Sequence, residues 1–434
     1  MKRVGNLWND LCSTSNAVRA INLGTVNKRK DSVVKRMLGY TDNHPDHVGK
    51  LDPQKVARYA KALVEALSSM EWRPSPMRHC VINPPYGKRR EIDCPALSDH
   101  IVHWMLILSI KPIIMRGMYE HSYGSIPGRG IDGARRAVER WVQHDEKAKY
   151  FVKLDIRKFY PNIDQEKLKA SFRRAIKDPR VLDLVDKVIG AIPSGLPIGA
   201  YTSQWFANFF LQSLDHYIAQ ELYKTRRGKR LNYVAHYLRY MDDMLLIGTS
   251  KRDLEKAVRA VMEFARKTYG LEIKNCWEIR TIAKSVEDVG TGIAPIDIVG
   301  YRFYQDHTEV RGKVFLHTSR IAARIVRRLE KESVVLIRDA QAIVSLCGWF
   351  SHADSEYFFT HYIYNRISIK FMREVISYAS KNGIDGEAAR VFCSERKPDG
   401  HRDILFGRSG GAARRRYIVE CDCLDDGLCL DGEP

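Results

Sequence analysis

Apolar positions follow helical spacing through most of the first 75 residues of the chain. The clearest case is 53–70, where Asp52 and Pro53 mark a helix start. Residues 78–93 differ, because two short apolar or alternating runs flank a Pro-Pro-Tyr-Gly turn, which predicts a β-hairpin. Beyond the hairpin, the pattern predicts a helix over 95–120, a Gly-rich basic loop over 122–132 and a helix from about 132 to 144.

The middle of the chain alternates strands and helices. YFVKLDI at 150–156 is a continuous apolar run that ends in a carboxylate, and YVAHYLRYMDDMLLIG at 233–248 reads as two strands meeting at an acidic pair. The other elements predicted here are helices at 164–176, 180–191, 200–220 and 251–269 and a strand at 271–273. This order fits a βαββαβ sheet backed by helices, which brings the end of the first strand beside the turn of the central hairpin.

The last third of the chain changes character. Strands are predicted at 298–304 and 313–317, and from 319 onward the pattern is helical and basic. Residues 340–390 are mixed helical and aromatic, and the tail after about 395 is rich in Gly and Arg before it turns acidic. Because no run approaches 18 apolar residues and the N-terminus has no apolar signal core, we expect a cytoplasmic protein without a membrane partner.

Length and charge narrow this picture. A chain of 434 residues is expected to fold as two or three subdomains. It carries 71 Lys and Arg against 52 acidic residues, a net charge of +19, and its last 18 residues carry −6, so the remainder is more basic still. Such a balance favours polyanionic partners, although a merely basic soluble protein remains the alternative. The nine cysteines form no pair of CxxC motifs, so we expect free thiols and no zinc site.

Three carboxylates are the candidates for chemistry. Asp155 ends the first predicted strand, and Asp242 and Asp243 lie 87 and 88 residues later between two apolar runs. Clustered acids on rigid strands are costly unless a cation neutralises them, and Mg²⁺ suits oxygen ligands that leave room for phosphates. Two such ions can drive phosphoryl transfer. A solvated hairpin turn is the alternative, and the second acid-ended strand weighs against it.

Several motifs resemble those of bacterial reverse transcriptases, in the order and spacing of that family from residue 1 to about 360. They are YMDD at 240–243, LDIRKFYPNID at 154–164, LPIGAYTSQWFAN at 196–208, VGYRFY at 299–304 and GKRREI at 87–92. The resemblance implies an α+β right-hand polymerase with fingers, a ferredoxin-like palm with a βαββαβ sheet, a helical thumb and a C-terminal extension. It implies a helical N-terminal region at 1–75, fingers at 76–150, a palm at 151–310, a thumb at 311–390 and a tail at 391–434.

The subgroup follows from smaller features. Most bacterial relatives have QGxxxSP where this chain runs from Ile198 to Gln204, with an apolar residue before the Gly and Gln in place of Pro. That departure, GNLWNDLCS at the start and GWFSHADS at 348–355 resemble the reverse transcriptases of diversity-generating retroelements and of phage defence. The extension beyond about 375 departs from the diversifying enzymes, so the expected role is antiphage defence, with diversification as the alternative.

The resemblance also implies site residues. Asp155, Asp242 and Asp243 would be catalytic and, with the Ile156 carbonyl, would hold two Mg²⁺ ions, or Mn²⁺. The implied nucleotide-binding set is Lys88, Arg90, the aromatic steric gate Tyr160, Gly199 and Gln204, the last tied to low fidelity. The implied contacts to template and primer are Arg129, Gly300, Tyr301, Arg320, Arg324, Arg327 and Arg328. The proton donor to pyrophosphate stays open, with Lys274 about two residues early.

The expected function is thus RNA-directed DNA synthesis. The expected partners are a template RNA, expected to be a cognate non-coding RNA, the cDNA product and dNTPs, together with an accessory protein or a homo-oligomer. Two alternatives remain at this point. RNA-templated RNA synthesis shares the palm, although Tyr160 and the YMDD form weigh against it. A non-catalytic RNA-binding scaffold belongs to another class, and the complete set of acids weighs against it.

Overall fold

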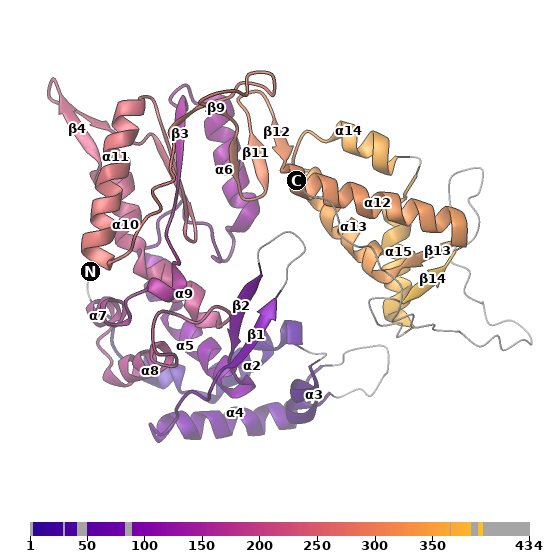
Figure 1. The fold of residues 1–434 in the computed structure, drawn as a ribbon. Coiled ribbons are helices and arrows are strands. Elements are labelled where there is room, and N and C mark those ends of the chain that lie inside the picture. Colours follow the sequence, from indigo (N-terminus) through magenta and orange to yellow (C-terminus); the bar gives the residue numbers. More distant parts are fainter. Residues whose placement is uncertain are drawn as a thin grey trace, which may run out of the picture. The chain divides into compact units, whose positions relative to one another are not determined.

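The computed structural model describes residues 3–28, 31–40, 50–82, 89–364, 366–382 and 389–393 and divides into two compact units. The first unit reaches His307, and the second begins at Thr308. Figure 1 shows the order of elements in each unit. We describe the two units separately. The division into fingers, palm and thumb at the bounds given above stays a prediction.

Helices open the first unit. They are α1 (Trp8–Leu11), α2 (Thr14–Gly24), the 3₁₀ turn η1 (Val26–Lys28), α3 (Ser32–Leu38), α4 (Pro53–Ser68) and α5 (Leu97–Arg116). The predicted start of α4 is confirmed, because the Asp52 side chain accepts hydrogen bonds from the Gln54 and Lys55 amides and Pro53 needs no such partner. Helix α5 is long and apolar enough to cross a membrane by composition alone, but more than half of it (56%) is buried in this unit. It is therefore the core helix against which α2 packs.

The predicted hairpin at 78–93 is also confirmed. Strand β1 (Arg78–Ile82) pairs antiparallel with β2 (Arg90–Cys94), with Ile82 opposite Arg90. The backbone N–H of Asp93 donates to the Ile198 carbonyl at 2.7 Å, which ties the hairpin to the loop before α9 (Tyr201–Phe210). Helix α6 (Gly130–His144) follows the Gly-rich loop, as predicted.

A five-stranded sheet lies at the centre of the first unit, in the order β6-β7-β3-β8-β9. Its strands are β3 (Tyr150–Asp155), β6 (His236–Tyr240), β7 (Asp243–Gly248), β8 (Arg280–Ile282) and β9 (Ile293–Ala294). All pairings are antiparallel except that of β8 with β9. Numbered along the chain, the first four strands stand in the order 2-3-1-4, which is the arrangement of a ferredoxin-like βαββαβ unit. The predicted fold class is confirmed.

Helices and a second hairpin complete the connections. The helical segments are α7 (Gln165–Ala175), α8 (Pro179–Ile189), α9, α10 (Gln212–His216), the π-helical turns η3 (Tyr217–Glu221) and η4 (Ala265–Tyr269), and α11 (Lys251–Phe264). Helix α11 packs on β3 and β7, where Leu254, Val258 and Val261 are fully buried. The single helix predicted over 200–220 is broken near Leu211, and the hairpin of β4 (Tyr223–Arg226) and β5 (Lys229–Asn232) was not predicted.

Three of the strand predictions were wrong in detail. At 271–273 only an isolated bridge joins Ile273 to Ile156, and the fourth strand of the sheet is β8. The apolar Leu271 and Ile273 are 1% exposed each, so they anchor the chain in the core without forming a ladder. The strand predicted at 298–304 is a hairpin of β10 (Ile296–Ile298) and β11 (Tyr301–Phe303) around Val299 and Gly300, both with positive φ. The run at 313–317 lies in a helix. It was predicted as a strand because an apolar run of five residues fits a strand and a helix equally well.

The second unit is largely helical, as predicted. Its elements are β12 (Thr308–Val310), α12 (Gly312–Glu332), β13 (Val334–Leu336), α13 (Ile337–Phe350), α14 (Glu356–Phe358), the π-helical turn η5 (Phe359–Ile363), α15 (Ile369–Lys381) and β14 (Arg390–Phe392). Helix α13 packs between α12 and α15, and β13 pairs antiparallel with β14. Phe350 and Phe358 stack at 3.8 Å in the interior of this unit.

Candidate active site at the edge of the central sheet

Two carboxylates stand side by side because of strand register. Asp155 is the last residue of β3, Asp243 is the first of β7, and the two are direct partners in the antiparallel ladder. Direct partners in such a ladder have Cα atoms about 4.5–5.5 Å apart. Asp242 precedes Asp243 in the turn from β6, where Met241 adopts a left-handed φ of 58°. The structure therefore brings the three predicted acids to one edge of the sheet.

The charges of these acids act on one another. Burial raises the pKa of Asp242, and the negative charges of Asp243 and Asp155 raise it further, while Lys274 lowers it. Lys274 Nζ lies 2.7 Å from Asp155 Oδ1, and both side chains are about two-fifths exposed (42% and 39%). This hydrogen bond and ion pair raise the pKa of Lys274. A cation is thus already drawn to the acids, and here it is an ammonium group.

The donor chemistry of this edge suits a divalent metal ion. Among the described residues, no three His, Cys, Asp or Glu side chains converge tightly enough to hold a cation as they stand. Asp155 is instead turned to Lys274. The three carboxylates nevertheless offer the hard oxygen ligands that Mg²⁺ prefers, and like charges crowded at Asp242 favour a neutralising cation. The residues therefore fit the predicted metal site, with Lys274 as the competitor for Asp155.

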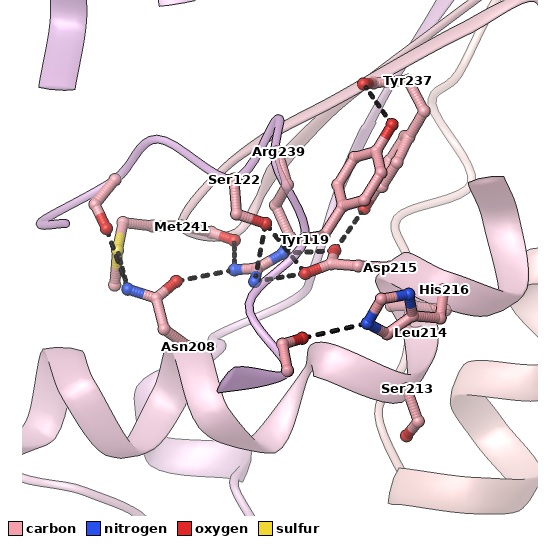
Figure 2. A network of polar contacts seen from close by, with 12 residues as sticks. Tyr119, Ser122, Asn208, Ser213, Leu214, Asp215, His216, Tyr237, Arg239 and Met241 are labelled. Carbon is pink, nitrogen blue, oxygen red and sulfur yellow. Dashed lines mark hydrogen bonds and ion pairs between the residues drawn. The ribbon is translucent and has the colours of Figure 1, made fainter. Parts of the chain in front are cut away.

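A fully buried ion pair lies next to Met241, the residue that precedes Asp242 (Figure 2). Arg239 of β6 and Asp215 of α10 are both 0% exposed, and the guanidinium Nε and Nη2 each donate to the carboxylate at 2.7 Å. The hydroxyl groups of Tyr237 and Ser122 donate to the same carboxylate at 2.8 and 2.9 Å. The Asp215 oxygens therefore receive four hydrogen bonds, which is the condition under which a buried charge pair is tolerated.

This buried network reaches the turn itself. Arg239 Nη1 donates to the Met241 carbonyl and to the Asn208 side-chain oxygen, each at 3.0 Å. Asn208 Nδ2 donates to the Gly124 carbonyl at 2.8 Å and lies 3.7 Å from the Met241 sulfur. A Cβ on Gly124 would come within 2.7 Å of the Met241 backbone nitrogen, so the loop and the turn are in direct contact. The position of the acidic turn is therefore set by α9, α10 and the loop at 122–125.

Sequence reasoning missed this network. The available signal was Arg239, a charged residue inside an otherwise apolar strand, because such a residue needs a partner if the strand is buried. Nothing in the sequence named Asp215 as that partner, since it is 24 residues away on a different element.

The structure places the predicted nucleotide-binding residues differently. Burial and then the charge of Asp242 raise the pKa of Tyr160, while the charges of Arg239 and Arg90 lower it. Tyr160 therefore lies within electrostatic range of both Asp242 and Arg90. Gly199 has φ 120°, and a Cβ there would lie 2.8 Å from the Asp93 carbonyl oxygen. Gln204 is exposed on α9, and Lys88 lies outside the described residues.

The predicted contacts of the first unit to template and primer have mixed placements. One guanidinium nitrogen of Arg129 donates to the carbonyls of Tyr119 and Ser122, which closes the Gly-rich loop on itself. Gly300 occupies the β10–β11 turn with φ 89°. The Tyr301 side chain is 3% exposed, so a nucleic acid could reach this hairpin through the Gly300 backbone but not through that ring.

The four predicted arginines of α12 divide into two pairs. Arg324 donates to Asp339 from Nε at 3.0 Å and from Nη2 at 2.7 Å, and Arg328 lies 3.6 Å from the same carboxylate, which is 2% exposed. Arg320 and Arg327 are exposed. Arg324 and Arg328 are therefore paired with Asp339, although 42% of the Arg324 side chain stays exposed, and Arg320 and Arg327 are the two that lie fully on the exposed side of the helix.

Comparisons with known proteins agree with this geometry. The family model described as "Reverse transcriptase (RNA-dependent DNA polymerase)" matches residues 82–276, which include all three acids. The chain is 25% identical over 238 residues to Protein YkfC of Escherichia coli K12, which covers 47% of this chain and 62% of that protein. It is 24% identical over 267 residues to the retron Ec73 reverse transcriptase of E. coli, covering 58% and 78%.

Two further comparisons are more distant. The group II intron-encoded protein LtrA of Lactococcus lactis is 23% identical over 229 residues, covering 50% of this chain and 38% of that protein. The chain thus spans less than two thirds of YkfC and of LtrA. Among solved structures, apo telomerase from Candida tropicalis aligns with a TM-score of 0.41 and 10% identity, covering 80% of this chain and 70% of that chain.

Proposed function

Because residues 82–276 form a domain of the reverse transcriptase family, we propose that this protein is an RNA-directed DNA polymerase. One observation carries the proposal above the others. Asp155 and Asp243 are register partners at the edge of a ferredoxin-like sheet, and Asp242 lies beside them in the turn between β6 and β7. The protein would copy a template RNA, of which a cognate non-coding RNA is our expectation, into cDNA from dNTPs in the cytoplasm.

Divalent ions held by the three acids and the Ile156 carbonyl would supply the positive charge for phosphoryl transfer, with Mg²⁺ expected and Mn²⁺ as a substitute. The residues of the chain would do the rest. Arg90 on β2 would bind the triphosphate through its planar guanidinium. The half-buried Tyr160 ring would exclude a ribose 2′-hydroxyl, and Lys274 is an available proton donor beside Asp155. Arg320 and Arg327 would hold duplex backbone.

The test is primer extension on an RNA template with a DNA primer, dNTPs and Mg²⁺. Asp155→Asn and Asp242→Asn should each abolish extension, while Asp10→Asn, at an exposed aspartate of α1, should leave it unchanged. Binding of the template RNA, measured in parallel, should persist in all three variants. A wild-type protein that binds RNA but extends no primer would instead support the scaffold function. Extension with NTPs in preference to dNTPs would support RNA-templated RNA synthesis.

We further propose a role in antiphage defence, with retroelement diversification as the alternative. The support is the sequence beyond about 375, which departs from the diversifying enzymes. A phage plating assay of cells that carry the wild-type or the Asp242→Asn protein tests this role. Protection that survives the substitution would count against cDNA synthesis as its basis, and mutations confined to one target gene would indicate diversification.

A further inference from the structure

The hairpin β4–β5 is a strongly basic, exposed element of the first unit. Residues 223–232 contain five Lys and Arg and no acid. Lys224 is only partly exposed, and its ammonium group binds the Asp253 carboxylate of α11 at 2.6 and 2.7 Å. The remaining four cations are exposed, and the structure gives them no ion pair with any described acid: they are Arg226, Arg227, Lys229 and Arg230. The hairpin thus presents four uncompensated charges on a short, fixed scaffold.

The tip of the hairpin has an arginine at a position whose left-handed backbone favours Gly, Asn or Asp. Arg227 and Gly228 form a two-residue turn with φ values of 51° and 71°, the geometry of a type I′ turn. Asn or Asp is the usual partner of Gly at such a turn, and an ordinary side chain in this left-handed region costs roughly 1–2 kcal/mol. An arginine at the tip is therefore not explained by the stability of the turn, and it adds to the charge of the hairpin.

One face of the hairpin also offers a flat stacking surface. The Arg230 guanidinium lies 3.8 Å from the centre of the Tyr223 ring, a cation–π pair across the two strands. Both residues are exposed, and Tyr223 retains 44% of its accessible surface. A solvent-exposed cation–π pair contributes little to the stability of the fold. Aromatic rings and guanidinium planes are, however, the surfaces on which unpaired bases stack in RNA-binding proteins.

The hairpin lies away from the acidic turn. It precedes β6, and the acids follow β6 at its other end, so the strand separates the two by roughly 15 Å. The backbone N–H of Ala235 donates a hydrogen bond to the Ile247 carbonyl of β7 at 2.8 Å, so pairing with β7 starts one residue before β6 begins. Figure 1 shows β4 beside α11, in agreement with the bond from Lys224 to Asp253. The hairpin therefore cannot contact the same nucleotide as the acids.

We propose that the β4–β5 hairpin is a docking site for an unpaired segment of the template RNA that flanks the copied stretch. This inference rests on the proposed function. Four uncompensated cations suit a phosphate backbone, and the Tyr223–Arg230 pair suits an unpaired base. The template is the favoured strand because the cDNA emerges paired to it. Docking outside the site of synthesis would let the protein select its own RNA while the copied stretch moves.

The test compares two labelled RNAs that share a primer-binding duplex, one with a 20-nucleotide unpaired flank and one without. The triple variant Arg226→Gln, Arg227→Gln, Arg230→Gln should bind the flanked RNA about tenfold more weakly, and the slope of log K against log[salt] should fall by about 2. Its affinity for the unflanked RNA should not change. The matched control replaces Arg19, Arg36 and Arg58, which are exposed on α2, α3 and α4, and should behave as wild type.

Two further measurements make the result decisive. Tyr223→Ala should weaken binding of the flanked RNA without changing the salt slope, since it removes a stacking surface and no charge. An RNA–DNA hybrid of the flank sequence should compete poorly. The proposal is overturned if the triple variant binds both RNAs as the control does, if both affinities fall equally, or if the hybrid competes as well as the unpaired strand. Thermal unfolding of each variant checks the fold, and primer extension on the unflanked RNA reports separately on the proposed function.

Discussion

Removing Arg239 should destabilise the protein strongly. The substitution Arg239→Met leaves the Asp215 carboxylate with 0% exposure and only the hydroxyl groups of Ser122 and Tyr237 as donors. Breaking a buried charge pair in this way costs about 3–5 kcal/mol, because the remaining charge stays desolvated. The exposed pair of Arg259 with Glu255 on α11 is the matched control, and Arg259→Met should cost less than about 1 kcal/mol.

A double substitution separates stability from the position of the acidic turn. Arg239→Met with Asp215→Leu removes both charges, and replacing a buried pair by apolar side chains is often close to neutral. Most of the lost stability should therefore return. The hydrogen bond to the Met241 carbonyl does not return, so primer extension should stay low because Asp242 is no longer held in place.

Urea unfolding followed by tryptophan fluorescence gives the free energies, and primer extension at several Mg²⁺ concentrations gives the activity. The double variant should need more Mg²⁺ for half-maximal extension, which a merely structural defect would not require. Three results would refute this reasoning. They are a loss below about 1 kcal/mol for Arg239→Met, a double variant no more stable than the single one, and a double variant with wild-type extension.

Three shorter predictions follow from individual residues. Gly199→Ala should cost about 1–3 kcal/mol in urea unfolding and raise the KM for dNTPs, because φ is 120° and the new Cβ would press on Asp93; wild-type values of both would contradict the contact. Tyr160→Ala should lower the ratio of kcat/KM for dNTPs over NTPs by at least about tenfold, and an unchanged ratio would remove Tyr160 as the steric gate. Burial lowers the pKa of His103 to about 3, below its value in the unfolded chain, so its stabilising contribution is complete above the unfolded pKa and is lost as pH falls. At pH 5 this loss is roughly 2 kcal/mol, and His103→Leu should flatten the decline in unfolding free energy between pH 6.5 and 5; an equally steep decline would show that His103 is not its source.

Strong local patterns made the centre of the fold predictable. The apolar run ending at Asp155 and the two runs flanking Asp242 and Asp243 each had the length and composition of a buried strand, and each is a strand. Their adjacency followed from the order of elements alone, because a βαββαβ unit has few ways to close. The predicted meeting of three acids thus depended on topology and needed no knowledge of any side-chain contact.

Short runs and long-range pairs were not predictable in this way. The run at 313–317 continues into the apolar face formed by Ile321, Ile325 and Leu329, and only that continuation identifies it as helix. The partner of Arg239 depended on how α10 packs against β6, which no local pattern encodes.

The arginines of α12 lie between these cases. Arg320 and Arg327 are seven residues apart on the exposed side of the helix, while Arg324 and Arg328 are four apart and turn toward Asp339. Helical spacing could have separated the two pairs, but only the fold could supply the carboxylate.

The contact of Gly124 with Met241 has a consequence for how this protein can evolve. The obstacle to any side chain at position 124 is the backbone nitrogen of Met241 and not only its flexible thioether, so shrinking residue 241 would not make room. A saturation library at 124 should therefore yield glycine alone among active clones. Second-site suppressors of Gly124→Ala should change the path of the main chain near residue 241. Substitutions in the two segments should therefore occur together.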